Sequence, residues 1–241
     1  MKILYVFPHP DDESFGPAAA IAKQVRQGHD VYLLTLTKGG ATKQRHKLGL
    51  SVEEMGEVRY KEMLCVEKVL GLKGMTVLDL PDGGLAEMDP REIEKVVHDQ
   101  IEELQPEIVV SYAVYGVSGF YDHLVMHAVI KRVYLEMKDN GVQYLKRLAF
   151  FGLGESNKAG DADSPFQLKR SEPALIDCIV EISEADVEKM CQALDCYESY
   201  KEVIEKTGVK NAVTDKVYFE IFGEDYMPEL KDLTDFPTAT G

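Results

Sequence analysis

The chain has 241 residues, of which 42 are acidic and 27 basic, and its formal net charge is −15 at neutral pH. This length fits one large α/β domain over residues 1–241, and the composition excludes a fibrous or disordered class. The negative charge argues against a nucleic-acid ligand, because phosphate binding needs a surface rich in Lys and Arg. No apolar run approaches the ~18 residues of a membrane span, and the first residues lack the pattern of a signal peptide. We therefore expect a soluble, cytoplasmic protein with no transmembrane segment.

Apolar runs and helical patterns alternate along the first half of the chain. Runs rich in Val, Ile, Leu and Tyr, which are typical of strands covered on both faces, occupy residues 3–7, 30–37, 75–80 and 107–115. Helical patterns lie between them at 16–28, 53–71 and 91–104. Gly71 is the predicted end of one helix, and Asp89 followed by Pro90 is the predicted start of the next. The alternation predicts a Rossmann-like, mostly parallel sheet with helices on both faces.

The second half of the chain is less regular. A helical pattern from about Asp122 to Met137 is followed by the run "LKRLAFFGLG" and by a loop at 155–165 rich in Gly, Asp, Ser and Pro. The runs "CIVEIS" and "KVYFEIFG" are typical of strands, and they flank a helical pattern from about Glu184 to Lys206 with Ser183 as its predicted cap. We therefore expect extra strands in the C-terminal third.

The four cysteines are far apart and form no CxxC pair; they are Cys65, Cys178, Cys191 and Cys196. Without a secretory signal, cysteines are expected to stay reduced, and most of these should be buried thiols. Because no CxxC pair occurs, a metal site built from cysteines is also disfavoured.

The segment "PHPDDE" directly follows the first predicted strand. In an open parallel sheet, ligands gather outside the carboxyl ends of the strands, so these side chains should face that crevice. Helix capping by Asp12 or Ser14 is the simplest alternative. Capping explains one aspartate, but it leaves His9, Asp11 and Glu13 without a reason.

A second cluster, "GVSGFYDHLVMH" at residues 116–127, follows the fourth predicted strand and opens a helix. It contains Asp122, His123 and His127, and two histidines four residues apart share one face of a helix. A lone histidine on a helix is more often a packed residue than a ligand. Two histidines and an aspartate at the same sheet edge as the first cluster instead predict a metal site.

These two motifs, with Arg59 and Glu62 in an RxxE spacing and "LDLPDGGL" at 78–85, resemble the LmbE-like or PIG-L-like family of zinc-dependent de-N-acetylases. The resemblance covers about the first 130 residues, and "KMCQALDCYESY" at 189–200 is a fainter echo. The resemblance implies a hydrolase that removes an N-acetyl group from a small-molecule amino sugar, such as an N-acetylglucosamine conjugate.

The resemblance also implies a ligand set, in which His9, Asp12 and His123 bind zinc and Asp11 is the general base. Three N and O ligands leave a tetrahedral zinc one open position for water, as catalytic sites require. Zinc lowers the pKa of that water to ~7, and Asp11 can accept the proton and pass it to the leaving amine. Iron or manganese could occupy the same set of ligands.

The sequence departs from the family at Phe120, where the family has a histidine that stabilises the oxyanion. Loss of one such donor typically lowers the rate ~100 to 1,000 fold. His127 and Tyr121 are the candidates to supply the missing proton or hydrogen bond. The alternative function is therefore a catalytically weakened module of the same fold that binds a metal and a sugar.

Four further residues near these motifs have open alternatives. Asp122 orients a histidine or caps its helix, and Glu13 forms a hydrogen bond near the metal or faces solvent. Arg59 resembles a family position that contacts substrate, or it forms a surface ion pair; Asp82 in "PDGG" meets sugar hydroxyls or belongs to an ordinary turn. The expected substrate-binding residues are Arg59, Asp82 and Tyr121. A dinucleotide-binding protein is disfavoured because no GxGxxG appears, and the oligomeric state stays open, a homo-oligomer included.

Overall fold

The computed structural model describes residues 1–155 and 168–237, which include a seven-stranded sheet in the order β3-β2-β1-β4-β5-β7-β6. The parallel strands are β1 (Lys2–Phe7), β2 (Asp30–Thr35), β3 (Gly74–Val77), β4 (Ile108–Tyr112) and β5 (Arg147–Gly152). β7 (Lys216–Ile221) runs antiparallel to both β5 and β6 (Cys178–Glu181). The mostly parallel sheet with extra C-terminal strands is confirmed, whereas the loop predicted at 155–165 lies, apart from Glu155, outside the described residues.

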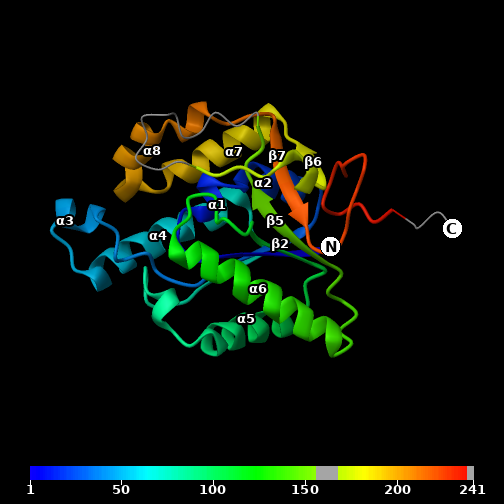
Figure 1. Cartoon of the computed structure of the whole chain (residues 1–241). Helices are drawn as coiled ribbons and strands as arrows, with labels where there is room; N and C mark the ends of the chain where they lie inside the picture. The colour runs from blue at the N-terminus through cyan, green and yellow to red at the C-terminus, as the bar shows by residue number, and fades with distance from the viewer. Residues whose placement is uncertain (156–167, 238–241) are drawn as a thin grey trace.

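Helices cover both faces of the sheet because side chains alternate along each buried strand. In β1, Tyr5 and Phe7 belong to one core cluster, and Leu4 and Val6 belong to the other. The first face is covered by α2 (Ala18–Arg26), α4 (Val52–Leu70) and α7 (Glu184–Asp195), and the second by α5 (Pro90–Leu104) and α6 (Tyr121–Asp139), as Figure 1 shows. Within the described ranges, none of the helices combines the length and the apolar character needed to cross a bilayer.

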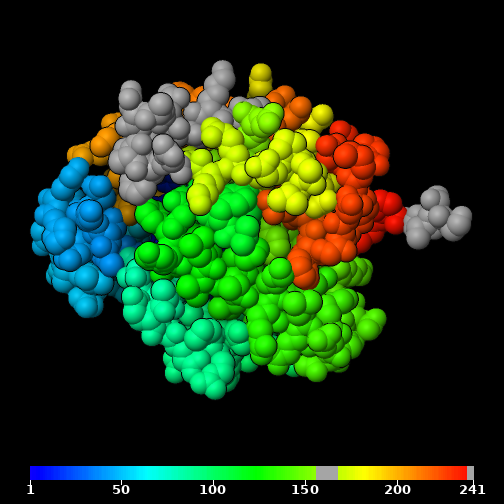
Figure 2. Space-filling model, in the orientation of Figure 1, coloured from blue at the N-terminus to red at the C-terminus, as the bar shows by residue number. Residues whose placement is uncertain are grey.

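The remaining helical elements are short. They are α1 (Asp12–Phe15), α3 (Gln44–Leu48), α8 (Lys201–Thr207), and the 3₁₀ turns η1 (Leu85–Glu87), η2 (Pro173–Leu175), η3 (Glu198–Tyr200) and η4 (Val209–Asn211). Figure 2 shows α3 projecting at one edge of the molecule, with the segment after β7 at the opposite edge.

The predicted helix boundaries follow from capping chemistry. The Asp89 carboxylate accepts a hydrogen bond from the Arg91 N–H at the start of α5, with Pro90 in the first turn. Ser183 caps α7, since its hydroxyl accepts from the Asp186 N–H. Gly71 ends α4 with φ 71°, a left-handed conformation that glycine adopts without a steric penalty. These predicted starts and this predicted end are confirmed.

The helix predicted over 184–206 is in fact two helices joined by a turn. α7 ends at Asp195, Tyr197 leaves the helical region with ψ 67°, and α8 begins at Lys201. The turn brings Cys196 against α4, where it forms a disulfide with Cys65 across a sequence separation of 131 residues. The expectation of reduced thiols is therefore wrong for Cys65 and Cys196. The spacing of the cysteines in the sequence did not indicate this disulfide. Cys178 and Cys191 are free thiols.

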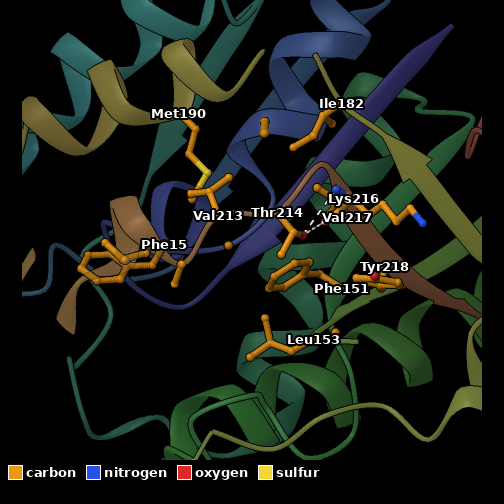
Figure 3. A pocket seen from close by; sticks show the side chains of 15 residues that line it. Phe15, Phe151, Leu153, Ile182, Met190, Val213, Thr214, Lys216, Val217 and Tyr218 are labelled. Atoms are coloured by element: carbon orange, nitrogen blue, oxygen red, sulfur yellow. Dashed lines mark hydrogen bonds between the residues drawn. The ribbon is translucent and has the colours of Figure 1, made fainter. Parts of the chain in front are cut away.

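A mostly apolar pocket is lined by residues of α1, α2, β5, α7 and the segment from Val209 to Tyr218 (Figure 3). Phe15, Phe151, Met190 and Val213 are among its lining residues. Of the described residues that line it, Lys216 is the one that carries a charge. The described lining contains no carboxylate, imidazole or thiol, so it does not provide the groups that hydrolytic sites most often use as acid, base or nucleophile.

Candidate metal centre

The order of the strands places both sequence clusters at one crevice. From β1 the chain builds the sheet through β2 and β3 in one direction, and β4 and β5 extend it in the other. The crevice between the carboxyl ends of β1 and β4 is the point where the strand order reverses, which is where open α/β sheets bind ligands. His9 follows β1 and His123 follows β4, so side chains 114 residues apart meet there.

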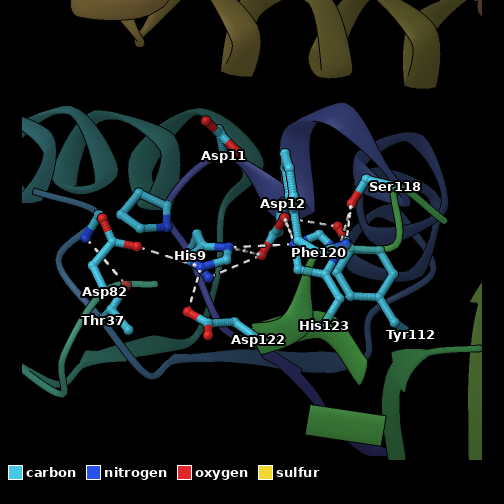
Figure 4. A network of polar contacts seen from close by, with 12 residues as sticks. His9, Asp11, Asp12, Thr37, Asp82, Tyr112, Ser118, Phe120, Asp122 and His123 are labelled. Atoms are coloured by element: carbon cyan, nitrogen blue, oxygen red, sulfur yellow. Dashed lines mark hydrogen bonds and ion pairs between the residues drawn. The ribbon is translucent and has the colours of Figure 1, made fainter. Parts of the chain in front are cut away.

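Three of the predicted side chains converge in this crevice. His9 Nδ1 lies 3.3 Å from His123 Nε2 and 3.5 Å from Asp12 Oδ2. His123 Nε2 lies 3.3 Å from Asp12 Oδ1. Figure 4 shows His9 between Asp122 on one side and the Asp12 and His123 pair on the other. The donor atoms of His9, Asp12 and His123 thus form one group that could hold a metal ion.

In His9 and in His123, one ring nitrogen faces away from the other two side chains of the group. The hydrogen-bond partner of that nitrogen indicates where the ring proton lies. His123 Nδ1 is 2.9 Å from the Gly116 carbonyl oxygen, which can only accept, so this nitrogen carries the proton. His9 Nε2 is 3.0 Å from the Asp122 carboxylate, which fixes its proton in the same way. Both remaining lone pairs then face each other and the Asp12 carboxylate. A cation among these atoms stabilises the arrangement, either as a metal ion or as a second proton on His9 Nδ1.

The electrostatics of the cluster agree with this conclusion. Burial lowers the pKa of His9, but its contacts with Asp12 and Asp122 more than offset this and raise it to about 10. Burial raises the pKa of Asp12, but His123 and His9 hold it well below its usual range. Two imidazole nitrogens and a carboxylate oxygen are also a donor set typical of zinc and other divalent transition metals. The residues present therefore fit a resident divalent cation.

Two residues that the sequence did not single out support these ligands. The Tyr112 hydroxyl donates to Asp12 Oδ1 at 2.8 Å, and its ring stacks on His123 with 4.3 Å between centroids. Gly116 has φ 61°, and a Cβ at this position would lie 2.6 Å from the Cβ of His123. Tyr112 is the last residue of β4, so its place at the end of a strand was the one available signal.

Asp122 orients His9 and does not cap its helix. Its carboxylate also accepts from the Gly83 N–H at 2.8 Å and the Leu85 N–H at 3.2 Å, and no side-chain cap forms at the start of α6. Asp82 lies on the same side, with Oδ1 3.4 Å from His9 Nε2 and Oδ2 2.7 Å from the Ala41 nitrogen. His9, Asp82 and Asp122 form a second group able to hold a cation, but the proton on His9 Nε2 favours the first group.

Asp11 and Arg59 form a buried ion pair beside the metal ligands. Arg59 is 2% exposed, and its Nη2 lies 2.5 Å from Asp11 Oδ2 and 2.8 Å from the Pro10 carbonyl oxygen. The alternative of a surface ion pair for Arg59 is therefore wrong. Burial raises the pKa of Asp11 to about 6, while the Arg59 charge opposes the rise.

Three other predicted or suspected residues lie outside the ligand group. His127 points its Nδ1 at the Tyr112 carbonyl oxygen, 2.9 Å away, and its ring packs on Phe150. Tyr121 is 76% exposed at the first turn of α6. Phe120 is half exposed and presents its ring edge-on to His123 at 5.6 Å. The crevice rim near His123 is thus aromatic, and His127 lies one helical turn deeper.

Known proteins resemble this chain over the part that carries the candidate site. The family model of GlcNAc-PI de-N-acetylase, PIG-L, matches residues 4–134, the part of the chain that includes both clusters. The 1D-myo-inositol 2-acetamido-2-deoxy-alpha-D-glucopyranoside deacetylase of Kineococcus radiotolerans is 29% identical over 158 residues, which cover 54% of this chain and 44% of that protein. The N-acetylglucosaminyl-phosphatidylinositol de-N-acetylase of Bos taurus is 30% identical over 142 residues, covering 57% and 52%. The chain therefore spans about half the length of these curated relatives.

A solved structure shows the same fold over nearly the whole chain. A deacetylase from the biosynthesis pathway of teicoplanin superposes with a TM-score of 0.68 and 13% identity. The superposition covers 92% of this chain and 97% of that one. The shared fold thus extends past residue 134, where the family match ends.

Proposed function

Because the chain belongs to the GlcNAc-PI de-N-acetylase (PIG-L) family, we propose that it is a zinc-dependent amidohydrolase that removes an N-acetyl group from an amino sugar, such as an N-acetylglucosamine conjugate. The observation that carries this proposal is the convergence of the His9 and His123 lone pairs with the Asp12 carboxylate. Both curated relatives described above are named as deacetylases of glucosamine derivatives, which supports the choice of substrate class.

The roles of the residues follow from their contacts. His9, Asp12 and His123 hold the cation, which when bound polarises the amide carbonyl and lowers the pKa of water. Arg59 occupies Oδ2 of Asp11, so we assign to Oδ1 the acceptance of a proton from the attacking water. The same oxygen then returns the proton to the nitrogen of the leaving amine. The Asp11 side chain is 16% exposed, so it is not closed off from solvent.

The rim residues set how the sugar binds and how fast the reaction runs. We assign Asp82 to the sugar hydroxyls, since its carboxylate lies 3.4 Å from His9 Nε2, and Tyr121 to the face of the sugar ring, since it is an exposed aromatic residue next to Asp122 in the chain. The Phe120 side chain has no polar hydrogen to donate to an oxyanion, so this position would add nothing to the stabilisation that a bound cation would supply. A slow enzyme follows, because a missing oxyanion donor typically costs ~100 to 1,000 fold in rate.

The experiment measures metal content and amine release together. Purified protein is analysed for divalent metals and then incubated with N-acetylglucosamine conjugates, and free amine is detected. Asp11→Asn should keep the metal and lose ~10² to 10⁴ in rate, the range of a lost general base. Asp99→Asn, at an exposed position on α5 beside Lys95, is the matched control and should behave like the wild type.

Two results would contradict the proposal. One is a wild-type protein without near-stoichiometric divalent metal, and the other is full activity in Asp11→Asn. Binding of metal and sugar without any amine release would instead favour a catalytically weakened module.

A further inference from the structure

The backbone of Asp11 has an unusual conformation. Its φ of 82° and ψ of −21° lie in the left-handed region, which is strained for a residue with a side chain. Such a backbone persists only where its surroundings hold it. Arg59 holds the Asp11 carboxylate and the Pro10 carbonyl, so a further group is needed for the Asp11 N–H.

Tyr197 supplies that group from a distant part of the chain. Its hydroxyl accepts the Asp11 N–H at 2.8 Å and donates to Glu13 Oε1 at 2.7 Å. Tyr197 and Glu13 are both 0% exposed, and the Ser14 hydroxyl donates to the same Glu13 oxygen at 2.6 Å. Because the single phenolic hydrogen is directed at Glu13, the oxygen lone pairs must face Asp11. The phenol therefore links the Asp11 backbone to the Glu13 side chain, on either side of Asp12 in the sequence.

The turn between α7 and α8 places Tyr197 in this position. On α4, one turn after Arg59, Glu62 accepts from the Ser199 N–H at 2.7 Å and from its hydroxyl at 2.8 Å. The Tyr200 ring lies over the Arg59 guanidinium at 3.9 Å, and the Cys65–Cys196 disulfide joins the same two elements. One helix thus holds both the side-chain partner of Asp11 and the segment that carries its backbone partner.

We infer that Tyr197 is a positioning residue for the reaction, because its hydroxyl holds Asp11 in the backbone conformation that presents the carboxylate to the reacting water. This inference rests on the proposed function, in which Asp11 is the general base. Tyr197 acts on the base and not on the cation or the sugar, since its hydroxyl bonds neither His9 nor Asp82 among the described contacts. Its loss should therefore lower kcat and leave KM and metal content unchanged.

The test is Tyr197→Phe, which removes the hydroxyl and keeps the ring. We expect kcat to fall by ~10 to 100 fold, the size of effect that a misplaced catalytic group produces. Tyr5→Phe is the matched control, because Tyr5 is also 0% exposed and its hydroxyl bonds a single side chain, Gln24, at 2.9 Å. It loses the same kind of buried hydrogen bond, here to Gln24 on α2 and not to the segment from His9 to Glu13, and its kcat should stay at the wild-type value.

A double-mutant cycle separates positioning from a general loss of stability. If Tyr197 acts through Asp11, Tyr197→Phe should have almost no further effect in the Asp11→Asn background, since groups that act as a unit are not additive. Additive effects, or a kcat loss no larger than that of Tyr5→Phe, would overturn the inference. If circular dichroism shows that Tyr197→Phe does not fold, Ser199→Ala takes its place in the cycle. Ser199→Ala removes one of the two bonds to Glu62 and should give a smaller kcat loss that is also absent in Asp11→Asn.

The outcomes also separate this inference from the proposed function. Absence of amine release by the wild type overturns the proposed function and the role of Tyr197 with it. Wild-type release that Asp11→Asn abolishes and Tyr197→Phe leaves intact overturns the role of Tyr197 alone.

Discussion

Replacement of Asp122 by asparagine should weaken metal binding although Asp122 lies outside the proposed ligand set of His9, Asp12 and His123. Its carboxylate accepts three hydrogen bonds, from His9 Nε2, the Gly83 N–H and the Leu85 N–H. Burial raises the pKa of Asp122, but its contact with His9 outweighs burial and lowers the pKa, so the group is ionised. Asparagine has one acceptor oxygen and no charge. Asp122→Asn therefore leaves at least one donor unpaired and frees the His9 ring to change tautomer or rotate.

The size of this effect follows from the position of Asp122 behind a ligand. Carboxylates that orient metal-bound histidines typically contribute 10 to 100 fold to metal affinity, which is about 1.4 to 2.7 kcal/mol. We expect the upper half of this range, because the Asp122 side chain is 2% exposed and water cannot replace it. Asp82→Asn is the control, since Asp82 lies farther from the same nitrogen, at 3.4 Å. Its effect on affinity should stay below the ~10 fold lower bound.

The assay is competition for Zn²⁺ between the protein and a chromophoric chelator, at one pH and one ionic strength. The dissociation constants of the wild type, Asp122→Asn and Asp82→Asn are compared, with circular dichroism as a check on folding. An unchanged affinity in Asp122→Asn would refute the reasoning, because His9 would then not depend on Asp122 for its tautomer. Equal losses in both variants would mean that general negative charge, and not orientation, supports the cation.

Three further predictions concern the rim, the deeper histidine and the disulfide. Phe120→His should raise kcat by ~10 to 100 fold, part of the value of one oxyanion donor; an amine-release assay with no gain would contradict this. Burial lowers the pKa of His127 from 6.5, so its neutral form stabilises the fold above that pH, and the contribution is lost as pH falls through the folded pKa. Urea unfolding should show that His127→Gln reduces this acid-side loss, with far less effect on kcat than the ~10² of a lost acid or base. Cys196→Ser should lower the unfolding free energy by about 3 to 5 kcal/mol, because the disulfide closes a loop of 131 residues; an unchanged denaturation midpoint would exclude a stabilising disulfide.

The sequence predicted the convergence of His9, Asp12 and His123 better than the contacts that support them, for a physical reason. The strand-end rule needs only local patterns, and it brought His9, Asp12 and His123 to one edge. Their spacing also put His127 on the same helix face, but four residues advance an α-helix by ~6 Å. At this position His127 Nδ1 contacts the Tyr112 carbonyl oxygen at the end of β4 instead of joining the group of His9, Asp12 and His123.

Other features depend on packing between distant segments, which no local pattern records. The burial of Arg59 under Tyr200 and the bond between Tyr197 and Asp11, 186 residues apart, are of this kind. The break after α7 could not be predicted either, because its apolar positions continue the helical pattern. At this break the chain turns at Tyr197, and the Tyr197 hydroxyl bonds Asp11 and Glu13. These contacts lie far away in the sequence.

The site therefore consists of two halves that meet between Asp11 and Asp12. The metal half depends on Asp122, within the residues that match the family, whereas the base half depends on Tyr197, beyond them. Adjacent residues with separate supports should respond separately to mutation. Asp122→Asn should lower metal affinity and keep kcat at saturating metal, and Tyr197→Phe should lower kcat and keep metal affinity. If each variant shifts both quantities, the short segment from His9 to Glu13 moves as one body, and the metal and the base cannot be tuned independently.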